Sequence, residues 1–244
     1  MASSGCWESA AATDVGQVRK LNEDAYLDRP DLGIWAVADG MGGHESGEVA
    51  SAMLCSSLAE LPHSCSLADA VDFVDSCVER VNRDLVAMAV ERDTGGVIGS
   101  TLVALVARGE HAVFLWAGDS RLYRRRNGQL QQLTDDHSLV EESRGRVPES
   151  THINSNIITR AVGADREIIL EVERMLLLDG DRFLLCSDGL NRDMDDSDIA
   201  GLLDPGLPAA VSSALVAKAV AAGGGDNITA LVAQYTEIRR EERH

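Results

Sequence analysis

The chain has 244 residues, of which 45% are hydrophobic and 25% are charged, a composition typical of a globular protein. Its 40 Asp and Glu residues against 22 Lys and Arg give a formal net charge of −18, and so acidic a surface disfavours nucleic acid and anionic membranes as partners. The sequence shows no apolar leader and no uncharged run of the roughly 18 apolar residues that cross a bilayer, which predicts a cytoplasmic protein. Five cysteines without a C-x-x-C pair are typical of reduced, mostly buried thiols in that compartment.

Several segments are predicted to be strands because they are short, apolar and rich in β-branched or aromatic residues. Asn127-Gly128 separates two of them as the two-residue turn of a tight hairpin, and the segment 108–111 is expected to close another. The predicted strands span 33–38, 100–107, 112–118, 121–126, 129–133, 168–173, 182–187 and 228–235.

Apolar residues that recur every three or four positions predict three helices. The first follows a glycine-rich stretch, at about 48–61. The second begins after Ser66, which can form a capping pair with Asp69. The third covers about 208–222 and ends at three consecutive glycines.

The predicted strands cluster in hairpins instead of alternating with helices, which favours an α+β fold built on antiparallel sheet. No internal repeat or linker interrupts the chain, so a single domain is expected. The long polar stretch 138–156 contains Gly145 and Pro148 and is predicted to be a loop or lid.

Four aspartates stand at the tips of apolar strands, each with a glycine beside it or close by. One Asp-Gly pair after a strand is more often an ordinary turn, but four of them can meet where strand tips converge. Carboxylates gathered in this way need a cation, and a ligand set of oxygen atoms selects Mg²⁺ or Mn²⁺ over Zn²⁺. The four residues are Asp39, Asp119, Asp188 and Asp226.

A further charged group precedes the first predicted strand. Arg19 is followed four and five residues later by Glu23 and Asp24. This group is either an exposed charged turn or an anion-binding arginine beside carboxylates that hold metal-bound waters, and the residues alone favour neither reading.

Other phosphate- and metal-binding motifs are excluded by their spacing. Gly40 and Gly42 lack the third glycine of a dinucleotide fingerprint, because Glu45 stands there, and no G-x-x-x-x-G-K-[ST] loop occurs. The histidines form no H-x-x-x-H or H-E-x-x-H pair, and a G-x-S-x-G elbow is absent. His44 and His137 lie near the acidic motifs. For both we expect either a surface position or an indirect role, in which the histidine supports a metal ligand without binding the ion.

Taken in order, these segments resemble the metal-dependent protein phosphatases, the type-2C serine/threonine phosphatases. The resemblance runs from about residue 14 to 233, and MGGH after the Asp-Gly is similar to the bacterial branch. The matching stretches are VRKLNEDA, VADGMGGHESGEVAS, GSTLVALV, WAGDSRLY, LTDDHSLV, NIITRAVG, FLLCSDGL and GGGDNITALV.

The resemblance implies a four-layer αββα sandwich, in which two antiparallel β-sheets are flanked by helices on both outer faces. It implies one catalytic domain over residues 1–244, with a core at about 10–236 and a short flap at about 138–156.

The resemblance also implies a centre of two Mn²⁺ or Mg²⁺ ions at one end of the sandwich. Asp39 matches the carboxylate that bridges the ions, and Gly40 matches the residue whose backbone carbonyl binds one of them. Asp188 and Asp226 match ligands of the other ion.

The remaining motif residues carry supporting roles in the family. Glu23 and Asp24 match the pair that holds metal-bound waters, and Arg19 matches the arginine that grips the substrate phosphate. In bacterial relatives a third, weaker ion is associated with the positions of Asp119 and Asp188.

The activity implied is hydrolysis of phosphoserine and phosphothreonine in proteins, by direct attack of a water or hydroxide shared by two ions. The implied partners are a phosphoprotein and a serine/threonine kinase whose action is reversed, and a monomer is expected. Animal relatives have a histidine directly after the Asp-Gly, whereas this chain has Met41 there, and bacterial relatives also have a methionine. The flap of this chain is shorter than usual in the family and lacks the family's common flap sequence.

Two alternatives remain. A pseudophosphatase that acts as a binding or regulatory module would have lost a ligand, yet Asp39, Asp188, Asp226 and Arg19 are all present. A phosphatase of small metabolites would need the same centre, and the sequence does not separate it from a protein phosphatase.

Overall fold

The strands of this chain send alternate side chains to opposite faces, and this alternation stacks the elements into layers. In β3 (Ile34–Met41), Ile34 and Ala36 pack toward helices, whereas Trp35 and Val37 pack toward a second sheet. The structure is a computed structural model, and it describes residues 4–42, 46–92, 96–143, 157–204 and 206–238.

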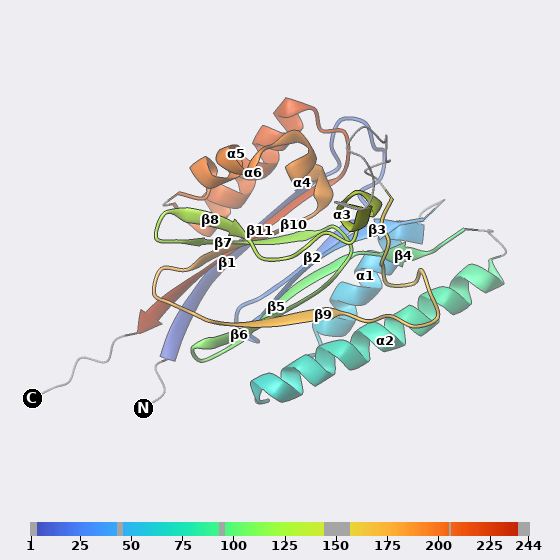
Figure 1. Cartoon of the computed structure of the whole chain (residues 1–244), viewed down its shortest axis with the longest axis horizontal. Helices are drawn as coiled ribbons and strands as arrows, with labels where there is room; N and C mark the ends of the chain where they lie inside the picture. The colour runs from blue at the N-terminus through green and yellow to red at the C-terminus, as the bar shows by residue number, and fades with distance from the viewer. Residues whose placement is uncertain (1–3, 43–45, 93–95, 144–156, 205, 239–244) are drawn as a thin grey trace, which may run out of the picture.

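Two antiparallel sheets form the centre of the molecule (Figure 1). One sheet has the order β1-β11-β10-β7-β8, and the other has the order β2-β3-β5-β6-β9, with β4 paired to the end of β3. The strands of the first sheet are β1 (Ser4–Asp14), β11 (Ile228–Ile238), β10 (Arg182–Cys186), β7 (Arg121–Arg126) and β8 (Gln129–Gln132). Those of the second sheet are β2 (Asp24–Arg29), β3, β4 (Gly99–Ser100), β5 (Leu102–Arg108), β6 (His111–Ala117) and β9 (Glu171–Leu176).

Helices cover the outer face of each sheet, as Figure 1 shows. The second sheet is covered by α1 (Ser46–Leu58) and α2 (Leu67–Glu91), and the first by α4 (Asp188–Asp193), α5 (Asp196–Leu202) and α6 (Pro208–Ala222). The short α3 (Leu139–Ser143) follows β8. Three apolar clusters fill the spaces between the layers, one between the two sheets and one under each helical layer. The predicted αββα sandwich is confirmed.

The predicted helices and turns are largely confirmed. Ser66 and Asp69 form a capping box, in which the Asp69 amide donates to Ser66 Oγ at 3.1 Å and the Ser66 amide donates to Asp69 Oδ2 at 3.2 Å. Asn127 (φ 52°) and Gly128 (φ 80°) make the two-residue turn between β7 and β8. All five cysteines are free thiols.

Some predicted elements differ from the observed ones. The predicted strand 100–107 is interrupted at Thr101, because the Asp39 amide donates to the Thr101 hydroxyl at 3.0 Å, while the Thr101 amide donates to the Asp39 carbonyl in register with the neighbouring pairs. The predicted strand 168–173 begins only at Glu171, because Ile168 packs against the cluster under α1 and α2 before the chain joins the sheet. The sequence did not predict β1, β2 or α4.

The predicted loop at 138–156 lies largely outside the described residues. Its first part forms α3, and Ser138 makes an isolated bridge with Ile158 at the far end of the loop. The remainder, 144–156, is not described, and neither is His44. None of the helices in the described ranges has the length and apolar character that a membrane crossing requires.

Candidate metal centre

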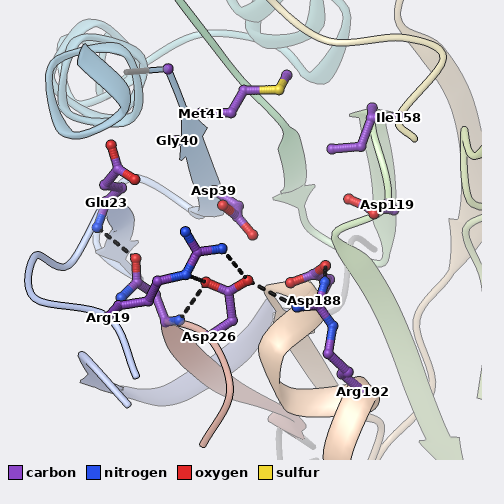
Figure 2. Close-up of a pocket in the computed structure, with 12 residues that line it drawn as sticks. Arg19, Glu23, Asp39, Gly40, Met41, Asp119, Ile158, Asp188, Arg192 and Asp226 are labelled. Carbon is purple, nitrogen blue, oxygen red and sulfur yellow. Dashed lines mark hydrogen bonds and ion pairs between the residues drawn. The ribbon is translucent and has the colours of Figure 1, made fainter. Parts of the chain in front are cut away.

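A cavity of about 250 Å³ at one end of the sandwich gathers nearly all the residues predicted for the site. Figure 2 shows the carboxylates of Asp39, Asp119, Asp188 and Asp226 facing a common space, whereas the Glu23 carboxylate points away from them. The lining residues are Arg19, Glu23, Asp39, Gly40, Met41, Gly42, Asp119, Ile158, Asp188, Arg192, Asp226 and Asn227. Of the predicted set, only Asp24 is absent from this lining, because it lies behind the cavity.

Asp39 is held by its main chain at the end of β3. Its amide donates to Thr101 Oγ1 at 3.0 Å, and its carbonyl accepts from the Thr101 amide at 2.9 Å and from Ser100 Oγ at 3.0 Å. The Thr101 hydroxyl lies 2.7 Å from the Ser120 hydroxyl, which ties this point to the turn after β6. Hydrogen bonds to Ser100 and to both the main chain and the hydroxyl of Thr101 therefore fix the Asp39 backbone.

Gly40 is required by close approach of neighbouring backbone. A Cβ atom there would lie 2.1 Å from the Gly47 carbonyl oxygen and 2.6 Å from the Glu23 carbonyl oxygen. The Gly40 amide donates to that Glu23 oxygen at 3.1 Å. This packing leaves no room for a side chain at position 40.

Asp24 faces Asp39 across the β2–β3 pair and joins the two sheets. Its Oδ2 accepts hydrogen bonds from Ser187 Oγ at 2.7 Å and from Thr229 Oγ1 at 2.7 Å, which lie at the end of β10 and on β11. Burial raises the pKa of Asp24 to about 7, although these two hydroxyls favour its charged form. Asp24 therefore links the two sheets directly behind the cavity.

Asn227 fastens the charged loop before β2 to the start of β11. Its Nδ2 donates to the carbonyls of Val15 at 3.0 Å and Leu21 at 2.9 Å, and its Oδ1 accepts from the Glu23 amide at 2.9 Å. The loop that carries Arg19 and Glu23 is thereby placed beside Asp226 at the cavity.

Asp119 follows a turn that a buried histidine supports. The Gly118 amide donates to His137 Nδ1 at 3.0 Å, and the His137 amide donates to the Gly118 carbonyl at 2.9 Å. Because Nδ1 accepts, the ring proton is on Nε2, which lies 3.0 Å from Glu171 Oε1. His137 is 5% exposed, so the predicted supporting role fits and the surface role does not.

Two arginines contact the carboxylates at the open side of the cavity. Arg19 Nε lies 2.8 Å from Asp226 Oδ1, and Arg19 Nη2 donates to Oδ2 at 2.8 Å. Arg192 Nη1 donates to Asp226 Oδ2 at 2.9 Å, and its Nη2 donates to Asp188 Oδ2. Asp226 is therefore held from two sides (Figure 2).

The cavity keeps an excess of negative charge. Its five lining carboxylates and two guanidiniums leave three formal negative charges. Burial, followed by the charges of Asp24, Asp188 and Asp119, raises the pKa of Asp39 well above its ordinary value. Burial and the charge of Asp188 raise the pKa of Asp119 to about 7. Carboxylates in this state favour a bound cation or a bound proton.

The donor set fits hard divalent ions. All the acidic groups offer oxygen, as Mg²⁺ and Mn²⁺ prefer. Within the described ranges, Asp24 Oδ1 and Asp119 Oδ1 are buried without a hydrogen-bond partner, so each has a lone pair to offer. Among the described residues, no three His, Cys, Asp or Glu side chains already enclose a metal position. Two of the carboxylates are instead paired with arginines: Asp226 with Arg19 and Arg192, and Asp188 with Arg192.

The sequence did not predict roles for Arg192, Asn227 or Ile158. Arg192 follows Asp188 by four residues, and a helix predicted over 188–193 would have placed both side chains on one face. Ile158 follows the undescribed part of the loop, and only tertiary structure brings it to the cavity.

Comparison with known proteins agrees with this architecture. A family model, protein phosphatase 2C, matches residues 17–219. Serine/threonine protein phosphatase PstP of Mycobacterium tuberculosis is 37% identical over 237 residues, which cover 93% of this chain and 45% of PstP. The chain thus spans about half the length of that relative.

Two solved structures show the same fold. PppA, described as a key regulatory component of T6SS in Pseudomonas aeruginosa, shares 43% identity at a TM-score of 0.89, over 96% of this chain and 100% of that one. The catalytic domain of PstP, solved in complex with 2 manganese ions, shares 33% identity at a TM-score of 0.83, over 96% and 100% of the two chains. The family model, the PstP sequence and both solved structures match most of the length of this chain. The chain therefore belongs to the protein phosphatase 2C family.

Proposed function

We propose that the chain is a metal-dependent protein serine/threonine phosphatase that uses two Mn²⁺ or Mg²⁺ ions. The observation that carries this proposal is the convergence of five carboxylates and two arginines in one cavity at the end of the sandwich. The proposal is supported by the names of the relatives, several of which are serine/threonine phosphatases, and by the two manganese ions of the PstP catalytic domain.

Asp39, the Gly40 carbonyl, Asp188 and Asp226 are proposed to hold the two ions. Two divalent ions would supply an activated water and positive charge for the phosphoryl oxygens, which unaided hydrolysis of a phosphate monoester lacks. The chain itself contributes a fixed backbone at Asp39 and the close packing at Gly40, which pre-organise the ligands before any ion arrives.

Glu23, Asp24 and Asp119 are proposed to support the centre. Glu23 lines the cavity, and Asp24 lies behind it with Oδ2 held by Ser187 and Thr229 and with a buried Oδ1 that has no partner among the described residues; both are proposed to hold metal-bound waters. Asp119, with one buried oxygen lacking a partner among the described residues, is proposed to bind a third, weaker ion together with Asp188.

Arg19 is proposed to bind the substrate phosphate. Its side chain is 51% exposed, and it can turn from Asp226 to an incoming phosphate with the same fork of N–H donors. Met41 has no proton to donate, and with Ile158 it gives the cavity an apolar border. An apolar border favours contact with the hydrocarbon part of a phosphorylated side chain over contact with a further charged group.

The wider assignments also remain proposals. They are a single catalytic domain with its core at about 10–236 and a flap at about 138–156, a cytoplasmic monomer, a phosphoprotein substrate and a serine/threonine kinase that the enzyme opposes.

The test compares phosphate release from a phosphothreonine peptide, a phosphoserine peptide and a set of sugar phosphates, each with Mn²⁺, Mg²⁺ or EDTA. A protein phosphatase is expected to require metal and to hydrolyse the peptides faster than the sugar phosphates. The reverse preference would indicate a small-metabolite phosphatase. Metal binding without turnover of any substrate would indicate a pseudophosphatase.

A further inference from the structure

Arg192 lies in the cavity, and the proposed function gives it no role. It stands on α4 one helical turn after Asp188, so the two side chains lie on the same face of the helix. Its Nη2 donates to Asp188 Oδ2, and its Nη1 donates to Asp226 Oδ2 at 2.9 Å. Figure 2 shows its side chain extending from α4 between these two carboxylates. One guanidinium therefore bridges a carboxylate on its own helix and a carboxylate in the loop before β11.

The bridged carboxylates are the two proposed to hold the same ion. Asp226 Oδ2 accepts from both Arg192 and Arg19, and Asp226 Oδ1 accepts from the Asn227 amide at 2.9 Å as well as from Arg19. A divalent ion that takes an oxygen of this pair must therefore either replace an N–H contact of Arg192 or bind beside its positive charge.

We infer that Arg192 is a competing cation built into the metal centre, which lowers the affinity for the ion held by Asp188 and Asp226. This inference rests on the proposed metal-dependent function. Two like charges at a few ångströms repel even in water, so a fixed guanidinium raises the Mn²⁺ concentration at which this position fills. The same guanidinium offsets the repulsion between Asp188 and Asp226, and so it holds both carboxylates at the cavity.

Removal of Arg192 changes Mn²⁺ affinity in opposite directions for the two roles that this side chain could have. A residue that only aligned two ligands would weaken Mn²⁺ binding when removed, whereas a competing cation strengthens it when removed. From Coulomb's law near the dielectric constant of water, loss of one charge about 7 Å from a divalent ion corresponds to an affinity gain of about tenfold.

The experiment is isothermal titration of the EDTA-treated and dialysed full chain with MnCl₂ at pH 8. The variants are Arg192→Gln and Arg192→Met, which remove the charge with different side-chain chemistry, and Arg192→Lys, which keeps it. The matched control is Arg125→Gln, which removes one positive charge from β7, where Arg125 pairs with Asp204. Thermal unfolding without metal reports whether each variant is folded.

Both neutral variants are expected to bind Mn²⁺ about tenfold more tightly at one position, and to melt at a lower temperature without metal. Arg192→Lys and Arg125→Gln are expected to stay within about threefold of the wild type. Unchanged or weaker Mn²⁺ binding in the folded neutral variants would overturn the inference and leave the proposed function intact.

Failure of the proposed function gives a different pattern. A wild-type chain that binds Mn²⁺ and releases no phosphate from any substrate would refute the phosphatase, while the comparison of affinities would still decide the role of Arg192. A wild-type chain that binds no Mn²⁺ would overturn both.

Discussion

Asp24 and Asp39 are direct partners across the antiparallel pair of β2 and β3, so two carboxylates share one face of the sheet at its end. Asp24 Oδ2 is held by hydroxyls of Ser187 and Thr229 from the opposite sheet. The Asp24 carboxylate therefore lies directly behind Asp39. The two hydroxyls stabilise its negative charge but do not neutralise it. The fold therefore accepts a destabilising cluster at the point where a cation is proposed to bind.

Replacement of Asp24 by Asn is expected to stabilise the metal-free protein. At pH 8 the Asp24 carboxyl is charged, and burial beside other carboxylates raises its pKa to about 7, so the neutral isostere should increase the free energy of unfolding by about 2 kcal/mol. Urea denaturation in EDTA measures the change. Asp72→Asn, on the exposed side of α2, is the matched control. A less stable Asp24→Asn protein would show that the hydrogen bonds outweigh the charge.

The stability of the metal-free protein is expected to rise as the pH falls from 8 to 6. Asp24 and Asp119 have folded-state pKa values of about 7, above the ordinary value of 3.8. Between pH 3.8 and about pH 7 the folded state therefore binds more protons than the unfolded state. Their contribution is fully present below pH 3.8 and is lost as the pH rises through about 7.

Thermal unfolding in EDTA from pH 6 to 8 measures this slope, and the double variant Asp24→Asn, Asp119→Asn is expected to flatten it. The increase in melting temperature that excess Mn²⁺ gives should shrink over the same range as the pH is lowered, because protons compete for the same oxygens. A slope identical in the double variant would assign the effect to other groups.

Gly40→Ala is expected to disrupt the end of β3. The added methyl group would lie 2.1 Å from the Gly47 carbonyl oxygen, which is backbone and cannot rotate away, so we expect a loss of about 3 kcal/mol in the free energy of unfolding. Gly109→Ala is a useful comparison, because the added group meets nothing within 4 Å and only the positive φ of 60° opposes it. Urea denaturation should rank Gly40→Ala as the more damaging; the opposite order would refute the packing argument.

His137→Ala is expected to destabilise the turn that carries Asp119. It leaves the buried Gly118 amide without its side-chain acceptor, which costs about 1–3 kcal/mol. His137→Asn can return an acceptor oxygen to that amide without reaching Glu171, so it should recover part of the loss. Denaturation curves of the two variants test this order. Equal stability of His137→Ala and wild type would mean that the ring is dispensable.

The strand-end aspartates could be predicted from the sequence because their signal is local. Asp39 and Asp188 each follow an apolar run and precede a glycine, and strands of one sandwich end together. Met41 and Gly42 belong to the same local pattern and also line the cavity.

Other parts depend on contacts that no local pattern carries. The strand β1 pairs with β11 over its whole length from Ser4 to Asp14, although its small and polar residues lack a regular apolar alternation. The helix α4 is too short to show a period, so the position of Arg192 beside Asp188 was not predicted. Asn227 acts through the carbonyls of Val15 and Leu21, and such contacts become visible only when β11 lies beside the loop before β2.

The most direct measurement is phosphate release from a phosphothreonine peptide by wild type and by Asp39→Asn, each with saturating Mn²⁺ and each shown to be folded by circular dichroism. In the proposed mechanism two ions share Asp39 and supply most of the catalysis, so kcat/KM is expected to fall by about a thousandfold or more in the variant, and wild-type activity is expected to vanish in EDTA. A folded Asp39→Asn protein that kept wild-type activity, or wild-type activity that persisted in EDTA, would contradict a metal centre built on Asp39.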